Sequence, residues 1–309
     1  MSIYKTRLQA LRQEMKAIGI DAYIIPQTDA WQAESLNSCD ERLHYICGLK
    51  ASAGYVIVTT DKAVVMIDGR YTVQAKEQVD ASLFDIEYYT NTRPIDWAIK
   101  NIRADGIIGF DPWLQTISDR ETMDKAGASL KAIENNIVDT IWHDRTAPPA
   151  QTAVLHDIEF AGKNIDEKLN LVAQNCHAPT LIAAPDSLAW LLNVRVLNNT
   201  QAPGLRGYAV LNPTSKTITT YTDVDCSALS HPSITFKPLN DIQNIHTPLA
   251  TPKSAPSWFL EKSNALIDHD PCVMPKACKN DIEQNGIRAS HKRDAVAVKN
   301  TIDWIKSSS

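Results

Sequence analysis

Arg70 has a side chain whose chemistry could bind a ligand that carries a carbonyl or a carboxylate. It follows a glycine in the segment Asp68-Gly69-Arg70-Tyr71. A guanidinium stays charged at physiological pH and offers a planar fork of donors that fits a carboxylate or a peptide carbonyl. The simpler alternative is that Arg70 pairs with Asp68 or is solvated. The residues alone favour this alternative, because such surface pairs carry little binding energy.

Histidine and cysteine occur at short spacing in two places: Cys39, His44 and Cys47, and His269, Cys272 and Cys278. Thiolate and imidazole are the usual ligands of zinc, but neither group has the paired Cys-x-x-Cys spacing of a zinc site. Ser52 lacks the Gly-x-Ser-x-Gly turn that exposes a nucleophilic serine. We therefore predict free buried thiols, and neither a metal-binding nor a catalytic residue in this chain.

The composition is that of a globular protein, with 44% hydrophobic and 22% charged residues. A length of 309 residues exceeds one ordinary hydrophobic core and predicts two domains. The net charge of -5, with Lys and Arg dispersed, offers no basic stripe to a nucleic acid, and no apolar run could span a membrane. Six cysteines without a secretion signal predict a reducing, cytoplasmic location.

Short strands and amphipathic helices surround Arg70 and must position it. Strands are predicted at 21–26, 55–59, 63–67 and 106–110, and helices at 6–18 and 71–79. The two Val- and Ile-rich strands in the middle are separated by three turn residues, which predicts an antiparallel hairpin. Strands interleaved with helices indicate an α/β domain, in which a mixed sheet is flanked by helices.

Paired prolines, Pro148-Pro149, predict a linker within residues 142–152, so the first domain is expected at 1–147. The following residues repeat the order of the opening segment. An amphipathic stretch, an apolar run and a polar loop ending in Ala189-Trp190 follow the same plan as the opening helix, strand and loop ending in Ala30-Trp31. This repeat indicates a duplicated domain at 153–274, with strands at 208–211 and 217–221.

From Lys279 onward the pattern is helical, with apolar residues spaced among charged ones. An amphipathic helix is stabilised mainly by burying its apolar face, so this one needs a surface to pack against. Residues 275–309 are therefore expected to open a further domain that is absent from the chain.

Six segments resemble, in the same order, the creatinase/aminopeptidase P superfamily, and within it the three-domain Xaa-Pro aminopeptidases of the cytosolic type. They are residues 22–26 (Ala-Tyr-Ile-Ile-Pro), 52–54 (Ser-Ala-Gly), 68–71 (Asp-Gly-Arg-Tyr), 141–145 (Ile-Trp-His-Asp-Arg), 189–195 (Ala-Trp-Leu-Leu-Asn-Val-Arg) and the helical pattern of 279–304. The resemblance implies two tandem creatinase N-terminal-like α/β domains and the start of a catalytic domain.

The resemblance also implies a function. Such enzymes remove the N-terminal residue that precedes proline, and they use two manganese or zinc ions to activate a bridging water. Their ligands, two Asp, one His and two Glu, belong to a third domain, so this chain alone is expected to be inactive and to hold no cofactor. Its expected partners are its own catalytic domain and short peptides with proline second, and the parent protein could form a homodimer. Arg70 is expected to reach toward the substrate.

Two other readings stay open. The chain could be a stand-alone binding or assembly module of the same fold without peptidase activity. It could also come from a relative such as creatinase or prolidase, but those carry one N-terminal domain, and two α/β units precede the last helix here.

Overall fold

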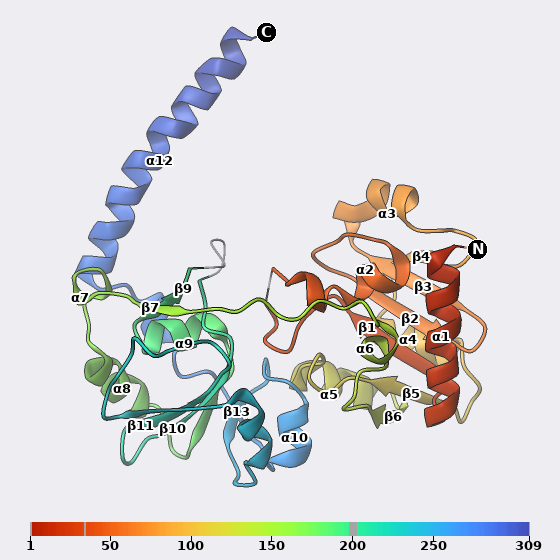
Figure 1. Cartoon of the computed structure of the whole chain (residues 1–309), viewed down its shortest axis with the longest axis horizontal. Coiled ribbons are helices and arrows are strands. Elements are labelled where there is room, and N and C mark those ends of the chain that lie inside the picture. Colours follow the sequence, from red (N-terminus) through yellow and green to blue (C-terminus); the bar gives the residue numbers. More distant parts are fainter. Residues whose placement is uncertain (1, 34, 198–202, 309) are drawn as a thin grey trace. The chain divides into compact units, whose positions relative to one another are not determined.

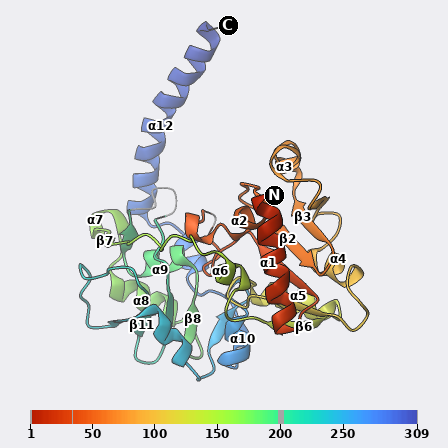
Figure 2. The same cartoon turned by 45° about the vertical axis from the view of Figure 1, so that its right-hand side comes forward.

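The computed structural model describes residues 2–33, 35–197 and 203–308 (Figures 1 and 2). Close contacts group the chain into two compact units. The first comprises Met1–Ala150 and Gln243–His269, and the second comprises Gln151–Ile242 and Asp270–Ser309. Each unit contains a hydrophobic core of its own. No helix within the described ranges is long and apolar enough to cross a membrane.

A six-stranded mixed sheet forms the centre of the first unit, in the order β4-β3-β2-β1-β5-β6. Its strands are β1 (Ala22–Pro26), β2 (Tyr55–Thr59), β3 (Ala63–Ile67), β4 (Asp85–Tyr88), β5 (Ile107–Phe110) and β6 (Ser129–Ala132). β2 runs antiparallel to β1 and β3, as the hairpin pattern predicts, with Tyr23 opposite Val58. The pairs β3–β4, β1–β5 and β5–β6 are parallel.

Helices cover both faces of this sheet because its central strands are apolar on both sides. In β1, Tyr23 and Ile25 belong to one core, whereas Ala22 and Ile24 belong to the other, as strand alternation requires. The first core includes side chains of α1 (Ile3–Ile18), α2 (Arg42–Cys47) and α6 (Ile137–Ile141). The second includes side chains of α4 (Pro94–Lys100) and α5 (Ile117–Lys125). The first unit is therefore a three-layer α/β domain.

The helix α1 follows directly from its sequence. Leu8, Leu11 and Met15 recur at three- and four-residue spacing and are fully buried, and each contributes roughly 1.5–3 kcal/mol on burial. Gly19 ends the helix with a φ of +68°, a left-handed conformation that glycine adopts without steric cost. The remaining short helices of this region are η1 (Ser38–Asp40), η2 (Gly69–Tyr71) and α3 (Thr72–Gln78).

A buried ion pair joins α2 to α6. Arg42 donates from Nε and Nη2 to the carboxylate of Asp139, at 2.7 and 2.9 Å. Arg145, just after α6, donates from Nη1 to the same carboxylate at 2.7 Å. The Arg42 side chain is only 7% exposed, so water hydrates its charge poorly. The carboxylate of Asp139 compensates this buried charge.

Residues 252–258 lie against the turn that follows β5, although they are more than 130 positions away in sequence. Ile117 donates its backbone N–H to Ala255 O at 2.9 Å. Trp113 stacks on Trp258 with ring centroids 4.5 Å apart. This segment includes β13 (Ala250–Pro252) and α10 (Trp258–Lys262), and it explains why residues 243–269 group with the first unit.

The second six-stranded sheet has the order β12-β11-β10-β8-β13-β14. Its further strands are β8 (Thr180–Ile182), β10 (Tyr208–Asn212), β11 (Thr217–Tyr221), β12 (Ile234–Lys237) and β14 (Leu266–Asp268). Read in chain order, these strands occupy the same positions as β1 to β6 of the first sheet. The directions agree as well, with β8–β10 and β10–β11 antiparallel and β11–β12 and β13–β14 parallel. The duplication indicated by the sequence is confirmed.

The core of the second unit includes side chains of α8 (Ile165–Ala173) and α9 (Pro185–Leu191). The other helices are α7 (Ile158–Ala161), α11 (Val273–Ala277) and α12 (Asp281–Ser307), with η3 (Leu239–Asn244) and a small sheet of β7 (Ala153–Leu155) and β9 (Val194–Val196). The polar loop expected at 185–190 was wrong, because these residues form α9. Pro185 stands at its first turn, where a missing N–H costs nothing, and Asp186 favours the same helix end.

Lys168 on α8 is buried in this core, with 1% of its surface exposed. Its ammonium donates to Trp190 O at 2.9 Å and to Asn193 Oδ1 at 2.5 Å. Burial lowers the pKa of Lys168 to about 8, because the charged form loses water. The group nevertheless keeps two acceptors, so it links α8 to the end of α9.

The last helix, α12, is predicted correctly from residue 279 onward but buries none of its side chains along the length that the structure describes. Asn280 begins it with a capping box, since its side chain accepts from Glu283 N while Glu283 accepts from Asn280 N. Asn280 also donates to Ala161 O of α7 at 2.9 Å. Apolar side chains farther along, including Val296 and Trp304, are 60% and 67% exposed.

Candidate substrate-binding site around Arg70

Arg70 lies in η2, the short helical turn that follows β3. Asp68 precedes this turn and accepts a hydrogen bond from the backbone N–H of Arg70 at 2.9 Å. The buried strand β3 fixes where the turn begins, and the side chain of Asp68 caps it. The turn therefore presents the Arg70 side chain at the surface, with 64% of the side chain exposed.

The Arg70 side chain pairs with Asp68, which is the simpler of the two alternatives given in the sequence analysis. Its Nη2 is 2.7 Å from Asp68 Oδ2, and its Nε is 3.1 Å from both carboxylate oxygens. The hydrogen bonds from Arg70 hold the pKa of the Asp68 carboxyl well below its ordinary range. The carboxylate stays ionised and holds the guanidinium in place, while the exposed edge of the fork remains accessible to a ligand.

Two tyrosines connect the Arg70 turn to a neighbouring cavity. Tyr89 donates its hydroxyl to Asp68 Oδ2 at 2.8 Å and packs edge-on against Tyr55, with ring centroids 5.7 Å apart. The Tyr71 hydroxyl accepts from Ser52 N at 2.9 Å and lies 2.7 Å from Ser52 Oγ. Tyr55, Tyr89 and Ser52 all line the cavity, so the turn that carries Arg70 is bonded to its wall.

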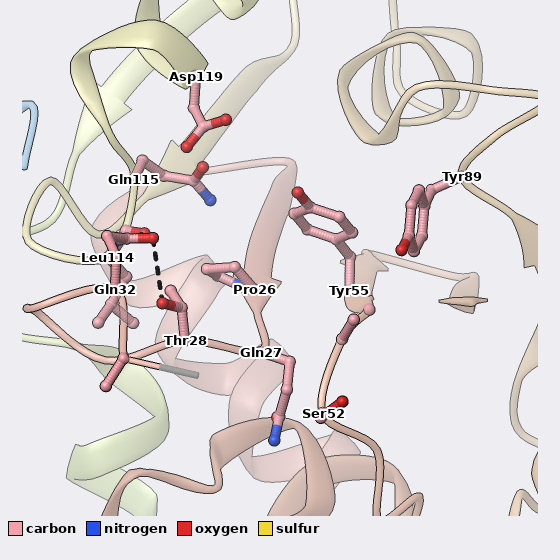
Figure 3. A pocket seen from close by; sticks show the side chains of 13 residues that line it. Pro26, Gln27, Thr28, Gln32, Ser52, Tyr55, Tyr89, Leu114, Gln115 and Asp119 are labelled. Atoms are coloured by element: carbon pink, nitrogen blue, oxygen red, sulfur yellow. Dashed lines mark hydrogen bonds between the residues drawn. The ribbon is translucent and has the colours of Figure 1, made fainter. Parts of the chain in front are cut away.

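The cavity has a volume of about 270 Å³ and opens where β1 and β5 end (Figure 3). It is lined by Pro26, Gln27, Thr28, Gln32, Ala33, Ser52, Ala53, Gly54, Tyr55, Tyr89, Leu114, Gln115 and Asp119. Ligand sites in α/β domains often lie beyond the carboxyl ends of strands, where the connections diverge. Thr28 donates to Gln32 Oε1 at 3.1 Å, which orders one side of the cavity.

The turn after β5 fixes Gln115 in this wall. Asp111 accepts from Trp113 N at 2.8 Å, and its backbone carbonyl accepts from Gln115 N at 3.1 Å. The next residue, Thr116, begins α5 with a capping box to Asp119. Both ends of this short turn are therefore held. Figure 3 shows the side-chain amide of Gln115 pointing toward the space between Thr28 and Tyr55.

The Tyr55 hydroxyl is a neutral donor in this wall. Burial raises the pKa of Tyr55 to about 12, and the nearby Asp119 and Tyr89 add to the effect. Asp119 uses one carboxylate oxygen to accept from the Thr116 N–H and hydroxyl, at 2.9 and 2.7 Å. The cavity thus combines neutral hydrogen-bonding groups with one carboxylate that already holds the helix end.

The histidine and cysteine groups bring no metal site together in the described ranges. No cluster of three or more His, Cys, Asp or Glu side chains that could hold a metal ion occurs there. Cys39, Cys47 and Cys272 are free thiols and buried as predicted, whereas the free thiol Cys278 is exposed. It follows the short helix α11, whose side chains are not buried, and so it faces solvent. Burial raises the pKa of Cys47 to about 12, which leaves this thiol unreactive.

The sequence identified Arg70 but missed the cavity beside it. Gln27 and Gln115 are 88 positions apart, and a lone glutamine carries no pattern that marks a site. One local signal existed: Thr116-x-x-Asp119 matches a helix-capping sequence and begins six positions after the end of the strand at 107–110, so it predicts a short turn at that strand end. Only the parallel pairing of β1 with β5 brings the two glutamines to one edge of the sheet.

Comparison with known families accounts for most of the chain. The model described as "Creatinase/Prolidase N-terminal domain" matches residues 7–141, and a second model of the same description matches residues 144–283. The chain belongs to the creatinase/prolidase N-terminal domain family. It contains two such domains in tandem, which agrees with the repeated strand order of the two sheets.

Curated relatives of these creatinase/prolidase N-terminal domains are Xaa-Pro aminopeptidases. A "Probable Xaa-Pro aminopeptidase P" of Aspergillus niger is 31% identical over 97% of this chain and 54% of its own length. One from Paracoccidioides lutzii is 30% identical over 97% of this chain and 55% of its own length. The chain therefore spans about half the length of the curated relatives that it matches.

A solved structure shares the fold of the whole chain. The X-prolyl aminopeptidase from Caenorhabditis elegans, described as a cytosolic enzyme with a di-nuclear active site, superposes with a TM-score of 0.85 and 23% identity. The match covers 99% of this chain and 56% of that one. At this identity the likeness shows that the tandem arrangement of domains is shared.

Proposed function

We propose that this chain is the non-catalytic N-terminal part of a metal-dependent Xaa-Pro aminopeptidase, an enzyme that removes the N-terminal residue preceding proline. The main support is that nearly the whole chain aligns, at 30–31% identity, with about half the length of curated relatives named as such enzymes. In this proposal residues 1–147 and 153–274 are the two domains, and residues 275–309 begin the catalytic domain. The remaining part of the parent protein would hold two manganese or zinc ions.

The exposed face of α12 supports the proposed start of a further domain. This helix of 27 residues begins with a complete capping box, yet it buries none of its side chains in the described chain. Exposed apolar residues recur along it, among them Ile287, Ile302 and Ile305. A helix of this kind is stabilised by covering such a face, and the catalytic domain is the occupant that the relatives' greater length suggests.

In the same proposal Arg70 contributes to substrate binding. The pair with Asp68 orients the guanidinium, and its exposure leaves donors for a peptide carbonyl or a terminal carboxylate. The domains would thereby restrict the cleft to short peptides with proline second. We place the parent protein in the cytoplasm, as described for the C. elegans relative, and free thiols suit that reducing compartment. We also propose that the parent protein forms a homodimer.

The test compares this chain with the product of the reading frame that continues past Ser309. With manganese and the tripeptide Ala-Pro-Ala, the 309-residue chain is expected to show no turnover, whereas the longer product releases the first alanine. Turnover by the short chain would contradict the proposal. A reading frame that ends without a two-metal ligand set would instead favour a stand-alone binding or assembly module.

The role of Arg70 is tested in the longer product by Arg70→Ala. Loss of a charge-assisted hydrogen bond is expected to lower kcat/KM roughly 10- to 100-fold. Arg103→Ala is the matched control, because Arg103 is also exposed and also pairs with an aspartate, Asp21, at 3.0 Å. Equal effects of the two substitutions on kcat/KM would show that Arg70 has no specific role in substrate binding.

A further inference from the structure

Two polar atoms at the cavity lack hydrogen-bond partners among the residues that the structure describes. They are Gln115 Nε2, a donor, and Gln27 Oε1, an acceptor. Gln115 is 3% exposed, and its Nε2 has lost water without gaining a partner among the described residues. Leaving a buried polar atom unpaired costs about 1–3 kcal/mol, which a ligand that completes its hydrogen bond would recover.

Hydrogen bonds hold the side chain of Gln27 and the backbone of Gln115. Gln27 is fixed because its Nε2 donates to Ala51 O at 2.8 Å, which leaves Oε1 as the free end of the amide. Gln115 is fixed by the held turn after β5, and its backbone carbonyl accepts from Ser257 N at 2.8 Å. The donor and the acceptor are thus preorganised at the cavity in the unliganded chain.

The charges at the cavity select against an anion. No lysine, arginine or histidine occurs among the described residues that line it, and Asp119 contributes a negative charge. A phosphate or carboxylate would therefore lose water without meeting a positive partner. The Tyr55 and Tyr89 rings provide an apolar wall, so the cavity suits a neutral ligand that carries both an N–H donor and a carbonyl acceptor.

We propose that this cavity binds the backbone of a short peptide, with Gln115 Nε2 donating to a peptide carbonyl and Gln27 Oε1 accepting from a peptide N–H. A volume of about 270 Å³ lies near the ~300 Å³ at the small end of ligand sites, which suits one or two residues rather than a long segment. The proposed function supplies the source of the peptide: residues that follow the proline of a substrate anchored at Arg70.

Contacts between this cavity, which we call the peptide subsite, and the turn that carries Arg70 indicate where a bound peptide would lie. Tyr89 lines the cavity and donates to Asp68, which pairs with Arg70. Ser52 also lines it, and its Oγ lies 2.7 Å from the Tyr71 hydroxyl. A peptide bound at Arg70 can therefore continue into the cavity along one wall, and longer peptides are expected to bind more tightly than tripeptides.

The test uses the 309-residue chain and the neutral peptide N-acetyl-Ala-Pro-Ala-Ala-amide. Two-dimensional NMR of side-chain amide groups reports directly on the two glutamines during a titration to about 50 mM. The expected result is a saturable shift of the Gln115 and Gln27 resonances. Absence of any shift at either glutamine up to that concentration overturns the proposal.

Gln115→Met keeps the length of the side chain but removes its donor, and it is expected to weaken binding about 10-fold or more. Gln9→Met is the matched control, because Gln9 is exposed on α1 and does not line the cavity. Unchanged affinity in Gln115→Met, with the fold verified by its backbone spectrum, also overturns the proposal.

The experiments distinguish a failure of the peptide subsite from a failure of the proposed function. The probe has no charged terminus and no cleavage is measured, so the subsite can be confirmed even if the longer product proves inactive. Conversely, an active longer product whose kcat/KM is the same for peptides of three and five residues, together with unshifted glutamines, would refute the subsite and leave the proposed function intact.

Discussion

Replacing Asp111 with asparagine should change how the stability of the first unit depends on pH. Asp111 is 5% exposed at the end of β5, and burial raises its pKa from an ordinary value of 3.8 to about 6. Hydrogen bonds from Asn136 Nδ2 and Trp113 N, at 2.8 Å each, and the charge of Arg42 oppose this rise but do not cancel it.

The magnitude follows from proton linkage. Because the folded-state pKa is raised, the folded protein binds more protons than the unfolded chain between pH 3.8 and about 6, so this carboxyl lowers stability as the pH rises through that window. A shift of roughly two pKa units corresponds to about 3 kcal/mol in total, of which about 2 kcal/mol falls between pH 4 and pH 7. Asp111→Asn removes this contribution.

The assay is urea unfolding at pH 4, 5, 6 and 7, followed by tryptophan fluorescence. Asparagine places an N–H₂ group where Asn136 also donates, so Asp111→Asn should be less stable than the wild type at pH 4, and the difference should shrink by about 2 kcal/mol at pH 7. Asp105→Asn, exposed just before β5, controls for the loss of one charge. A difference independent of pH, or a carboxyl carbon of Asp111 that titrates below pH 4.5 by NMR, would refute the reasoning.

Three further substitutions test other parts of the structure. Asp139→Asn removes the carboxylate that Arg42 and Arg145 share, and it leaves Arg42 with the more distant carboxylate of Asp40 at 3.7 Å. It should therefore destabilise the first unit by about 2–3 kcal/mol in urea unfolding, and an effect below about 0.5 kcal/mol would show that the pair is dispensable. Lys168→Met removes a contribution to the free energy of unfolding that rises with pH between about 8 and 10.5, because the pKa of Lys168 is lowered in the folded state. From pH 7 to pH 10 the stability of the wild type should therefore increase relative to that of the variant by up to about 2 kcal/mol. A difference that does not change with pH would argue against a desolvated ammonium. Asn280→Ala removes the capping box of α12 and the hydrogen bond from Asn280 to Ala161 O of α7, and should cost about 1 kcal/mol of helix stability, seen as faster amide hydrogen exchange in the first turns of α12 than in wild type. Unchanged exchange would mean that neither contact stabilises the helix start.

Much of the fold was predictable because local signals and tertiary packing agree. The hairpin at 55–59 and 63–67 has Val- and Ile-rich strands around a three-residue turn, and both strands are buried in the sheet as that pattern requires. The repeat was visible as a helix and an apolar strand in each half, and the two sheets share one strand order. By contrast, α9 was missed because its first residues, Pro185-Asp186-Ser187, resemble a polar loop as much as a helix start.

The candidate site was only partly predictable. Arg70 was proposed as a site residue only through the family resemblance, whereas its pairing with Asp68 could be predicted from two neighbouring positions. The cavity depends on residues from four separated segments that sheet pairing brings to one edge, and no single segment carries its signature. The packing of residues 252–258 on the turn after β5 was equally hidden, since a stacking pair such as Trp113 and Trp258 leaves no periodic trace in the sequence.

The packing of residues 252–258 on the turn after β5 joins two parts of the chain that lie on opposite sides of the segment 145–151 in sequence. A protease cut among residues 145–151, which form neither helix nor strand, would separate Trp113 and Trp258 onto different fragments. Their stacked rings and the backbone bonds between 112–118 and 253–258 would still link the fragments without any covalent bond. The nicked material should run as two bands in a denaturing gel yet elute as one species in native gel filtration. Expressing residues 1–147 alone would leave the Trp113 ring uncovered and prone to self-association.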